Sequence, residues 1–169
     1  MSVGDTRSRI LGSFVTAEGR AAVRMQDRYN TDITDLWSAI TDPARLARWL
    51  GEVEGDLRPG GTFRARFFAS GWEGTGTVQV CDPPERLLVL TTDADGSNQG
   101  TVELTLTAAG DQTVLVWEEQ VPPGLLPEYG AGIQVHVEDL DAYIQGQPCC
   151  DAAARWAELI PSYRALPRG

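Results

Sequence analysis

The stretch Leu36–Gly51 reads LWSAITDPARLARWLG, and the rest of the chain is best interpreted from it. Leu36 and Ile40 have the spacing of one helical face. Asp42 then interrupts this pattern. Pro43 suits the first turn of a new helix, because the N–H that proline lacks would have no partner there. The stretch therefore predicts two short helices joined at a proline. The apolar face of the second consists of Leu46, Trp49 and Leu50.

Strands are predicted on both sides of this helix pair. Before it, Arg20–Tyr29 alternates apolar and polar residues, which is typical of a half-buried strand. Thr31 or Asp32 then offers an N-cap for the first helix. After the helix pair, short turns such as RPGG at Arg58–Gly61 separate alternating segments, which predicts an antiparallel meander. The predicted strands are Phe63–Phe67, Gly74–Cys81, Leu87–Thr92, Thr101–Thr107 and Thr113–Val121.

A long amphipathic helix is predicted from about Pro127 to Gln145. An apolar stripe runs along it, and polar residues occupy the opposite side. The stripe contains Ile133, Val137, Leu140 and Ile144, and the polar side contains Gln134, Glu138, Asp141 and Gln145. A second amphipathic segment follows Pro148, and we expect it to pack on the domain or on a partner. Its apolar face contains Trp156, Leu159, Ile160 and Tyr163.

The order of these elements predicts an α+β fold. A curved antiparallel sheet has one apolar face to bury, and a single amphipathic helix can lie across that face. If the sheet curls around the helix without filling the gap, a cavity remains between them. Such a cavity would bind small apolar molecules.

Composition restricts the function further. A chain of 169 residues with 42% apolar and 22% charged residues predicts one soluble globular domain. The 14 basic and 24 acidic residues give a formal net charge of −10, which argues against nucleic acid or a membrane surface as a partner. No apolar run is long enough to span a bilayer, and the N-terminus lacks the features of a secretory signal. We therefore expect a cytoplasmic protein.

No metal or cofactor is predicted. The chain has one histidine, His136, and three cysteines, too few to assemble a zinc site or a disulfide framework. The adjacent Cys149 and Cys150 are interpreted as part of an ordinary C-terminal connection, with soft-metal binding or oxidation as the alternative. The glycines at Gly130 and Gly132 do not complete a dinucleotide-binding motif, because Val135 stands at the third position.

Three segments resemble the SRPBCC superfamily, the START-like (Bet v 1-like) helix-grip fold. Within it, the chain is similar to the branch related to the activator of heat-shock protein 90 ATPase. The resemblance covers about residues 21–148. The segments are DPARLARWLGEVEGDLRPGGTFRARF at 42–67, GTVQVCDPPERLLVLT at 76–91 and YGAGIQVHVEDLDAYIQGQP at 129–148.

The resemblance implies a curved antiparallel sheet wrapped around the long C-terminal helix, with two short helices after the first strand. It divides the chain into an N-terminal arm (1–19), a START-like domain (20–148) and a C-terminal helical extension (149–169). The chain departs from the family pattern at Ile133, where tryptophan is common, and at Glu119, near a common histidine. It also has Val137–Leu140 in place of Leu-Asp-Arg-Leu. The superfamily is functionally broad, so the fold alone leaves the function open.

Two glutamates on a predicted strand are candidates for the cavity. Glu118 and Glu119 are adjacent, so their side chains point to opposite faces of the sheet. By the register of the family we expect Glu119 to point inward, where Arg64, Arg66 or a raised pKa would have to compensate its charge. Exposure at the end of the sheet is the alternative.

His136 lies beside the apolar stripe of the long helix, and Tyr129 and Tyr143 lie on the same flank. This histidine could recognise a ligand or act as an acid or base, or it could be a core-edge residue bonded to a neighbour or to solvent. Trp37 is interpreted as a core residue. The full set of predicted ligand-binding residues is Trp49, Phe63, Phe67, Trp72, Trp117, Glu119, Tyr129, His136 and Tyr143.

Three functions are compatible with these observations. The leading hypothesis is a non-enzymatic domain that binds a small hydrophobic molecule. The second is a chaperone-interacting module, which the family resemblance implies. The third is an enzyme, such as a polyketide cyclase or a hydrolase, that uses His136, with or without Glu119. The sequence contains no recognisable set of catalytic residues. The ligand and the oligomeric state stay open.

Overall fold

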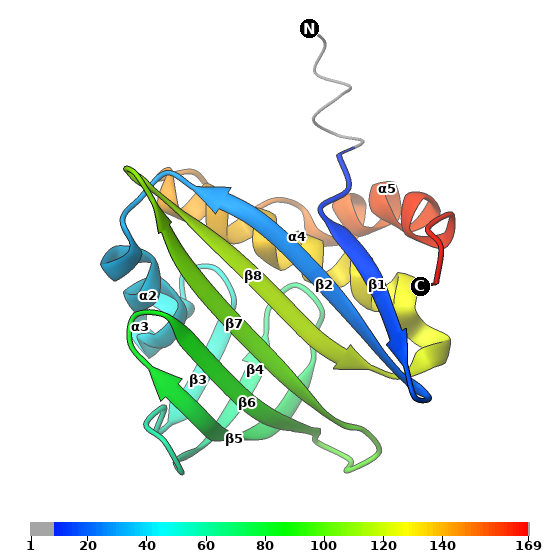
Figure 1. The fold of residues 1–169 in the computed structure, drawn as a ribbon, viewed down its shortest axis with the longest axis horizontal. Helices are drawn as coiled ribbons and strands as arrows, with labels where there is room; N and C mark the ends of the chain where they lie inside the picture. Colours follow the sequence, from blue (N-terminus) through cyan, green and yellow to red (C-terminus); the bar gives the residue numbers. More distant parts are fainter. Residues whose placement is uncertain (1–8, 169) are drawn as a thin grey trace, which may run out of the picture.

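A computed structural model of the chain describes residues 9–168. Within them, eight antiparallel strands form one sheet in the order β1-β2-β8-β7-β6-β5-β4-β3. The sheet is curved, and the long helix α4 (Leu126–Ile144) lies across its inner face (Figure 1). This arrangement confirms the predicted helix-grip α+β fold. The strands are β1 (Gly12–Ala17), β2 (Arg20–Tyr29), β3 (Gly51–Gly55), β4 (Thr62–Phe67), β5 (Glu73–Asp82), β6 (Arg86–Asp93), β7 (Gln99–Ala109) and β8 (Gln112–Val121).

The two edge strands were not assigned from the sequence pattern. Strand β1 falls within the predicted N-terminal arm and pairs with β2 from Gly12 to Ala17. Strand β3 follows directly on the helix pair and pairs with β4. Both strands are short, so their alternation is too brief to stand out. Residues 1–8 of the predicted arm and Gly169 of the predicted extension lie outside the described residues.

The helix pair forms, with α2 at Ile33–Thr41 and α3 at Pro43–Leu46. The second helix is shorter than predicted, because Trp49 and Leu50 follow it in a turn. The Asp32 carboxylate accepts a hydrogen bond from the Asp35 amide at 2.8 Å and caps α2. Asp42 ends α2 and also caps α3, because its carboxylate accepts from the Ala44 amide at 3.0 Å. One aspartate therefore sets the angle between the two helices. Trp37, interpreted as core, is partly buried and packs against the core.

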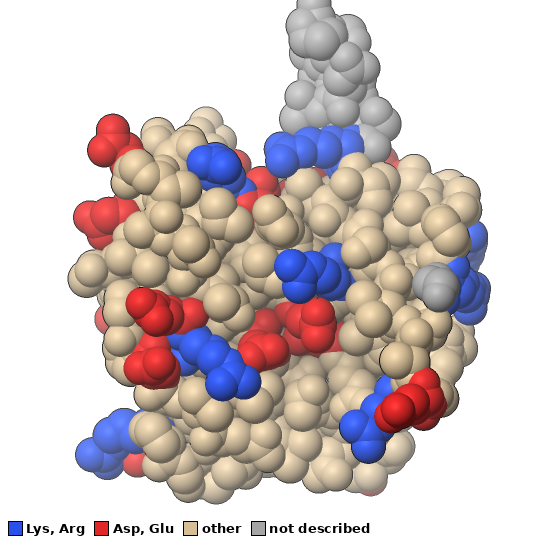
Figure 2. Space-filling model, in the orientation of Figure 1, with Lys and Arg blue, Asp and Glu red and all other residues tan. Residues whose placement is uncertain are grey.

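The core lies between the inner face of the sheet and α4. Leu140 on the apolar stripe of α4 is fully buried, as is Tyr29 at the end of β2. The Tyr29 hydroxyl donates to the Val137 carbonyl at 2.9 Å, which ties the helix to the sheet. The convex outer face carries acidic and basic side chains side by side (Figure 2). Arg24 pairs there with Glu118, and Arg86 with Glu103.

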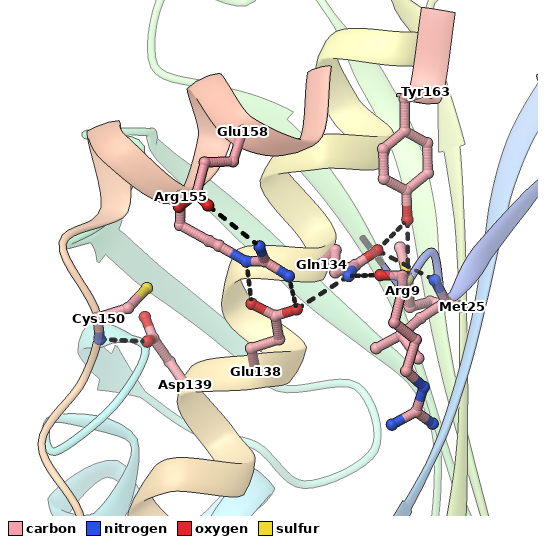
Figure 3. Close-up of polar contacts among 10 residues, drawn as sticks. Arg9, Met25, Gln134, Glu138, Asp139, Cys150, Arg155, Glu158 and Tyr163 are labelled. Carbon is pink, nitrogen blue, oxygen red and sulfur yellow. Dashed lines mark hydrogen bonds and ion pairs between the residues drawn. The ribbon is translucent and has the colours of Figure 1, made fainter. Parts of the chain in front are cut away.

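The C-terminal helix α5 (Ala152–Arg164) packs on the domain itself, against α4. A polar network joins the two helices (Figure 3). Arg155 donates two hydrogen bonds to the Glu138 carboxylate, at 2.7 and 2.8 Å. Tyr163 and Gln134 are both fully buried and hydrogen-bonded to each other. The polar side of α4 is therefore an interface with α5, not a solvated face.

The N-terminal segment completes this network. The Gln134 side-chain amide donates to the Arg9 carbonyl at 2.7 Å and accepts from the Leu11 amide at 3.1 Å. The Tyr163 hydroxyl accepts from the Gly12 amide at 3.1 Å. The start of β1 is thus held by both helices. Within residues 9–168, no helix is long and apolar enough to cross a membrane.

Candidate functional site

The sheet curls around α4 without filling the space between them. A cavity of about 670 Å³ remains, within the size range of small-molecule sites. Aliphatic side chains such as Leu46, Val89 and Ile133 form much of its wall. Six aromatic residues also line it: Phe63, Phe67, Trp72, Trp117, Tyr129 and Trp156.

Glu119 brings a carboxyl group into this wall. Strand β8 pairs with β2 and β7 so that Glu119 lies opposite Val23 and Val102, two apolar positions. Glu119 lines the cavity, whereas Glu118 points to the outer face and pairs with Arg24. The Trp117 indole N–H donates to Glu119 Oε1 at 3.1 Å. The inward orientation predicted for Glu119 is thus observed.

No arginine among the described residues lines the cavity beside Glu119. Arg66 pairs with Glu52 on the exposed side of β4, at 3.0 Å. Burial raises the pKa of Glu119 to about 7, although the Trp117 hydrogen bond lowers the pKa, and the nearby Asp93 raises it further. Of the two alternatives predicted, an arginine partner or a raised pKa, the structure has the second.

His136 projects from α4 into the same cavity and is 5% exposed. Its ring contacts Phe67 edge-on, with centroids 5.2 Å apart, and lies parallel to Trp117 at 6.3 Å. Nδ1 is buried and has no hydrogen-bond partner among the described residues. Burial lowers the pKa of His136 to about 4, so the imidazole is neutral at pH 7. Recognition of a ligand by His136 stays a prediction.

A second cluster of polar residues in the cavity wall consists of Asp93, at the end of β6, and Glu128, in the first turn of α4. The Trp72 indole N–H donates to Asp93 Oδ1 at 2.7 Å. Glu128 lines the cavity, and its Oε1 is buried without a hydrogen-bond partner among the described residues. The Trp156 indole N–H, from α5, donates to the Glu128 carbonyl at 3.2 Å. Helix α5 therefore contributes directly to the wall of the cavity.

Seven of the nine predicted site residues line the cavity, and two do not. The seven are Phe63, Phe67, Trp72, Trp117, Glu119, Tyr129 and His136. Trp49 is a core residue whose indole N–H donates to the Ala39 carbonyl at 3.0 Å. Tyr143 accepts a hydrogen bond from Arg45 at 2.8 Å, near the helix pair. We therefore leave Trp49 and Tyr143 out of the proposed site.

Among the charged and aromatic residues that line the cavity, the sequence did not indicate three: Asp93, Glu128 and Trp156. Trp156 had been assigned to an apolar helical face, but the position of that helix was left open. Asp93 and Glu128 lie at the end of a strand and in the first turn of a helix, where an acidic residue is ordinary. No local pattern distinguishes them.

The described residues contain neither an activated cysteine nor a metal-binding group. Cys81, Cys149 and Cys150 are free thiols. Burial and the neighbouring Asp139 raise the pKa of Cys150 to about 12, which makes it a poor nucleophile at neutral pH. Among residues 9–168, no group of three histidine, cysteine or acidic residues is placed to hold a metal ion.

The raised pKa of Glu119 predicts how the Glu119→Gln variant will respond to pH. The pKa is 4.5 in the unfolded reference and about 7 in the folded protein, so between these values only the folded state holds the proton. Glu119 thus destabilises the folded state increasingly as pH rises through this window. We expect the stability advantage of Glu119→Gln to grow from pH 4.5 through pH 7 and then level off, at about 3 kcal/mol.

Melting temperatures of both proteins between pH 4 and pH 8 measure this difference. His136 acts in the opposite sense, because its lowered pKa destabilises the folded state as pH falls from 6.5 towards 4. It is present in both proteins and cancels in the comparison. A difference that does not vary with pH would contradict the assigned environment of Glu119.

Comparison with known proteins agrees with this architecture. CalU16 from Micromonospora echinospora is 30% identical in its crystal structure, with a TM-score of 0.76; the match covers 92% of this chain and 94% of that one. DynU16, described as a protein in the dynemicin biosynthetic locus, is 26% identical over 77% of this chain and 50% of its own, with a TM-score of 0.70. A protein from Bordetella parapertussis, 21% identical over 95% of both chains with a TM-score of 0.70, shares the fold.

The sheet, the crossing helix and the cavity between them define a helix-grip protein of the SRPBCC type. A family model described as "Activator of Hsp90 ATPase homolog 1-like protein" matches residues 30–145. The chain belongs to this family. No curated protein is significantly similar to it in sequence.

Proposed function

We propose that this protein is a non-enzymatic binding protein for a small, largely apolar molecule held between the sheet and α4. The observation that carries the proposal is the cavity of about 670 Å³ with six aromatic residues in its wall. A concave, mostly apolar space of this size with a few polar groups is characteristic of small-molecule binding sites. The place of DynU16 in the dynemicin biosynthetic locus supports a role in small-molecule metabolism.

Ligand-dependent stabilisation tests the proposal. A molecule that binds only the folded protein stabilises it by mass action, by about 2.7 kcal/mol at 100 times its Kd. For a domain of this size we expect an increase in melting temperature of roughly 5–10 °C. The experiment screens fatty acids, polyketides and polycyclic aromatic compounds by thermal shift.

A variant with a filled cavity provides the matched control. Gly132 lines the cavity, and a Cβ atom added there would have no other atom within 4 Å. Gly132→Trp should therefore occupy the cavity without disturbing the core. Compounds that stabilise the unaltered protein should have little effect on this variant. If every compound acts equally on both proteins, or none acts on the unaltered protein, the proposed function is wrong.

An enzymatic role is the second candidate, and one observation favours it. A carboxyl group with a pKa of about 7, as at Glu119, suits general acid–base catalysis near neutral pH. Turnover of a cyclisable or hydrolysable aromatic substrate, abolished by Glu119→Gln or His136→Ala, would establish this role. The chaperone interaction rests on the family description alone.

A further inference from the structure

The charged groups in the cavity wall are all acidic. Three carboxyl groups line it, those of Asp93, Glu119 and Glu128. Among the described residues, no arginine lines the cavity, and the chain contains no lysine. His136 is the remaining basic group in the wall, and it is neutral at pH 7 because burial lowers its pKa to about 4. Arg164, which is 61% exposed, lies 3.9 Å from the Glu128 carboxylate. No positive charge in the cavity wall balances Asp93 or Glu119.

Unsatisfied polar atoms lie in the same place. In the described part of the chain, two buried side-chain atoms lack a hydrogen-bond partner, Glu128 Oε1 and His136 Nδ1. Both residues line the cavity, although buried polar groups in native proteins nearly always have partners. Residues 128 and 136 are two helical turns apart on α4, which separates them by about 12 Å along the axis. Such a spacing fits an elongated ligand with polar groups.

The aromatic wall adds a third feature. Cations are attracted to the faces of indole, phenol and phenyl rings, most strongly where water is excluded. Trp72 and Trp117 each donate an indole N–H to a carboxylate, Asp93 and Glu119 respectively, so these rings and carboxylates are in direct contact. Aromatic faces next to unneutralised carboxylates form an environment that favours a positively charged group over a neutral or negative one.

We infer that the ligand of this cavity is an elongated aromatic or polycyclic molecule that carries a protonated amine. The ammonium group lies between the aromatic rings and the carboxylates of Glu119 and Asp93, and the apolar body fills the aliphatic part of the cavity. The neutral imidazole of His136 accepts or donates a further hydrogen bond. This inference rests on the proposed binding function and specifies the chemistry of the ligand.

Binding of a cation is coupled to proton release. The titratable groups that interact with Glu119 are Asp93 at the end of β6 and Tyr129 on α4. Neither of them is a cation at pH 7, so an ammonium ion would be the first positive charge near Glu119. It would favour the carboxylate form. Since the pKa of Glu119 is about 7 without ligand, about half a proton should leave per amine bound at pH 7.

Three probes that differ only in charge test the inference: 9-anthracenemethylamine, 9-anthracenemethanol and 9-anthracenecarboxylate. Binding is measured by tryptophan fluorescence quenching and by calorimetry in two buffers of different ionisation enthalpy. We expect the amine to bind at least about tenfold more tightly than the alcohol, with the carboxylate weakest. Proton release should accompany the amine and not the alcohol.

Two variants with the same change in net charge locate the effect. Glu119→Gln should remove most of the preference for the amine and its proton release. Glu118→Gln alters the neighbouring carboxylate, which pairs with Arg24 on the outer face, and should retain both. If Glu119→Gln does not fold, proton release by the unaltered protein decides the question.

The outcomes separate the inference from the function on which it rests. Equal affinity for amine and alcohol would overturn the cationic ligand and leave the binding function intact. Binding of none of the three probes would overturn both, because the cavity would then not accept aromatic molecules of this size. Tighter binding of the amine to Glu119→Gln than to the unaltered protein would also overturn the inference.

Discussion

Arg155→Ala is expected to destabilise the protein by about 3 kcal/mol, because it breaks the ion pair that holds α5 against α4. The Arg155 side chain is 11% exposed and that of Glu138 27% exposed, so water only partly replaces the lost partner. The Glu138 carboxylate would keep one hydrogen bond, from the Gln134 amide at 2.9 Å. Urea unfolding at pH 7 measures the loss.

A second arginine on the same helix is the control. Arg164 is 61% exposed, and its nearest carboxylate oxygen, on Glu128, is 3.9 Å away. Arg164→Ala should cost less than about 0.5 kcal/mol, as exposed pairs do. Replacing both members of the buried pair, Arg155→Met with Glu138→Met, should recover part of the loss. If Arg155→Ala and Arg164→Ala behave alike, the ion pair does not anchor α5.

The same variant should affect the cavity. Ala152 and Trp156 of α5 line the cavity, so loosening the helix removes part of the wall. We expect ligands that stabilise the unaltered protein to bind Arg155→Ala more weakly, and the amides of α5 to exchange hydrogen faster. Amide exchange distinguishes local release of α5 from global unfolding.

Two glycines one residue apart in α4 should respond to alanine with opposite signs. At Gly130, a Cβ atom would lie 2.6 Å from Cδ1 of Tyr163 and 3.2 Å from Cε1 of Phe14. Tyr163 is fully buried and hydrogen-bonded, so it cannot move aside without displacing α5. Gly130→Ala should therefore destabilise by about 2 kcal/mol.

Gly132→Ala should instead stabilise the protein by about 0.5–1 kcal/mol. Its Cβ would meet no atom within 4 Å, and alanine loses less backbone freedom than glycine when a helix forms. The two variants carry the same chemical change on the same helix, so their difference isolates the contact with Tyr163. Melting temperatures of equal sign and size would show that α5 does not pack on Gly130 as described.

The helix-grip fold was predictable because its signals are local. Asp42 caps one helix as it ends another, and this role depends on residues adjacent in sequence. Strand β2 alternates over ten residues, and α4 carries a continuous apolar stripe. The inward orientation of Glu119 followed from the period of two along a strand together with the register of the family. These periodicities are a property of the chain itself.

The position of α5 was not predictable. Its apolar face could have packed on this domain or on a partner. An amphipathic pattern indicates that one face of a helix is buried, but it does not indicate which surface that face contacts. The deciding contacts join Tyr163 to Gln134 and Arg155 to Glu138, residues 29 and 17 positions apart. Gln134 belongs to the polar side of α4, and periodicity alone does not predict that this side packs against α5.

By itself, the sequence determined the order of the elements, the class of the fold and the inward face of β8. Only the tertiary structure decided that Trp49 and Tyr143 lie outside the cavity, and that Asp93, Glu128 and Trp156 lie within its wall. The physical reason is that a cavity forms where distant segments fail to fill a space between them. Residues from five strands and four helices line that space, and no local pattern encodes a volume they leave empty.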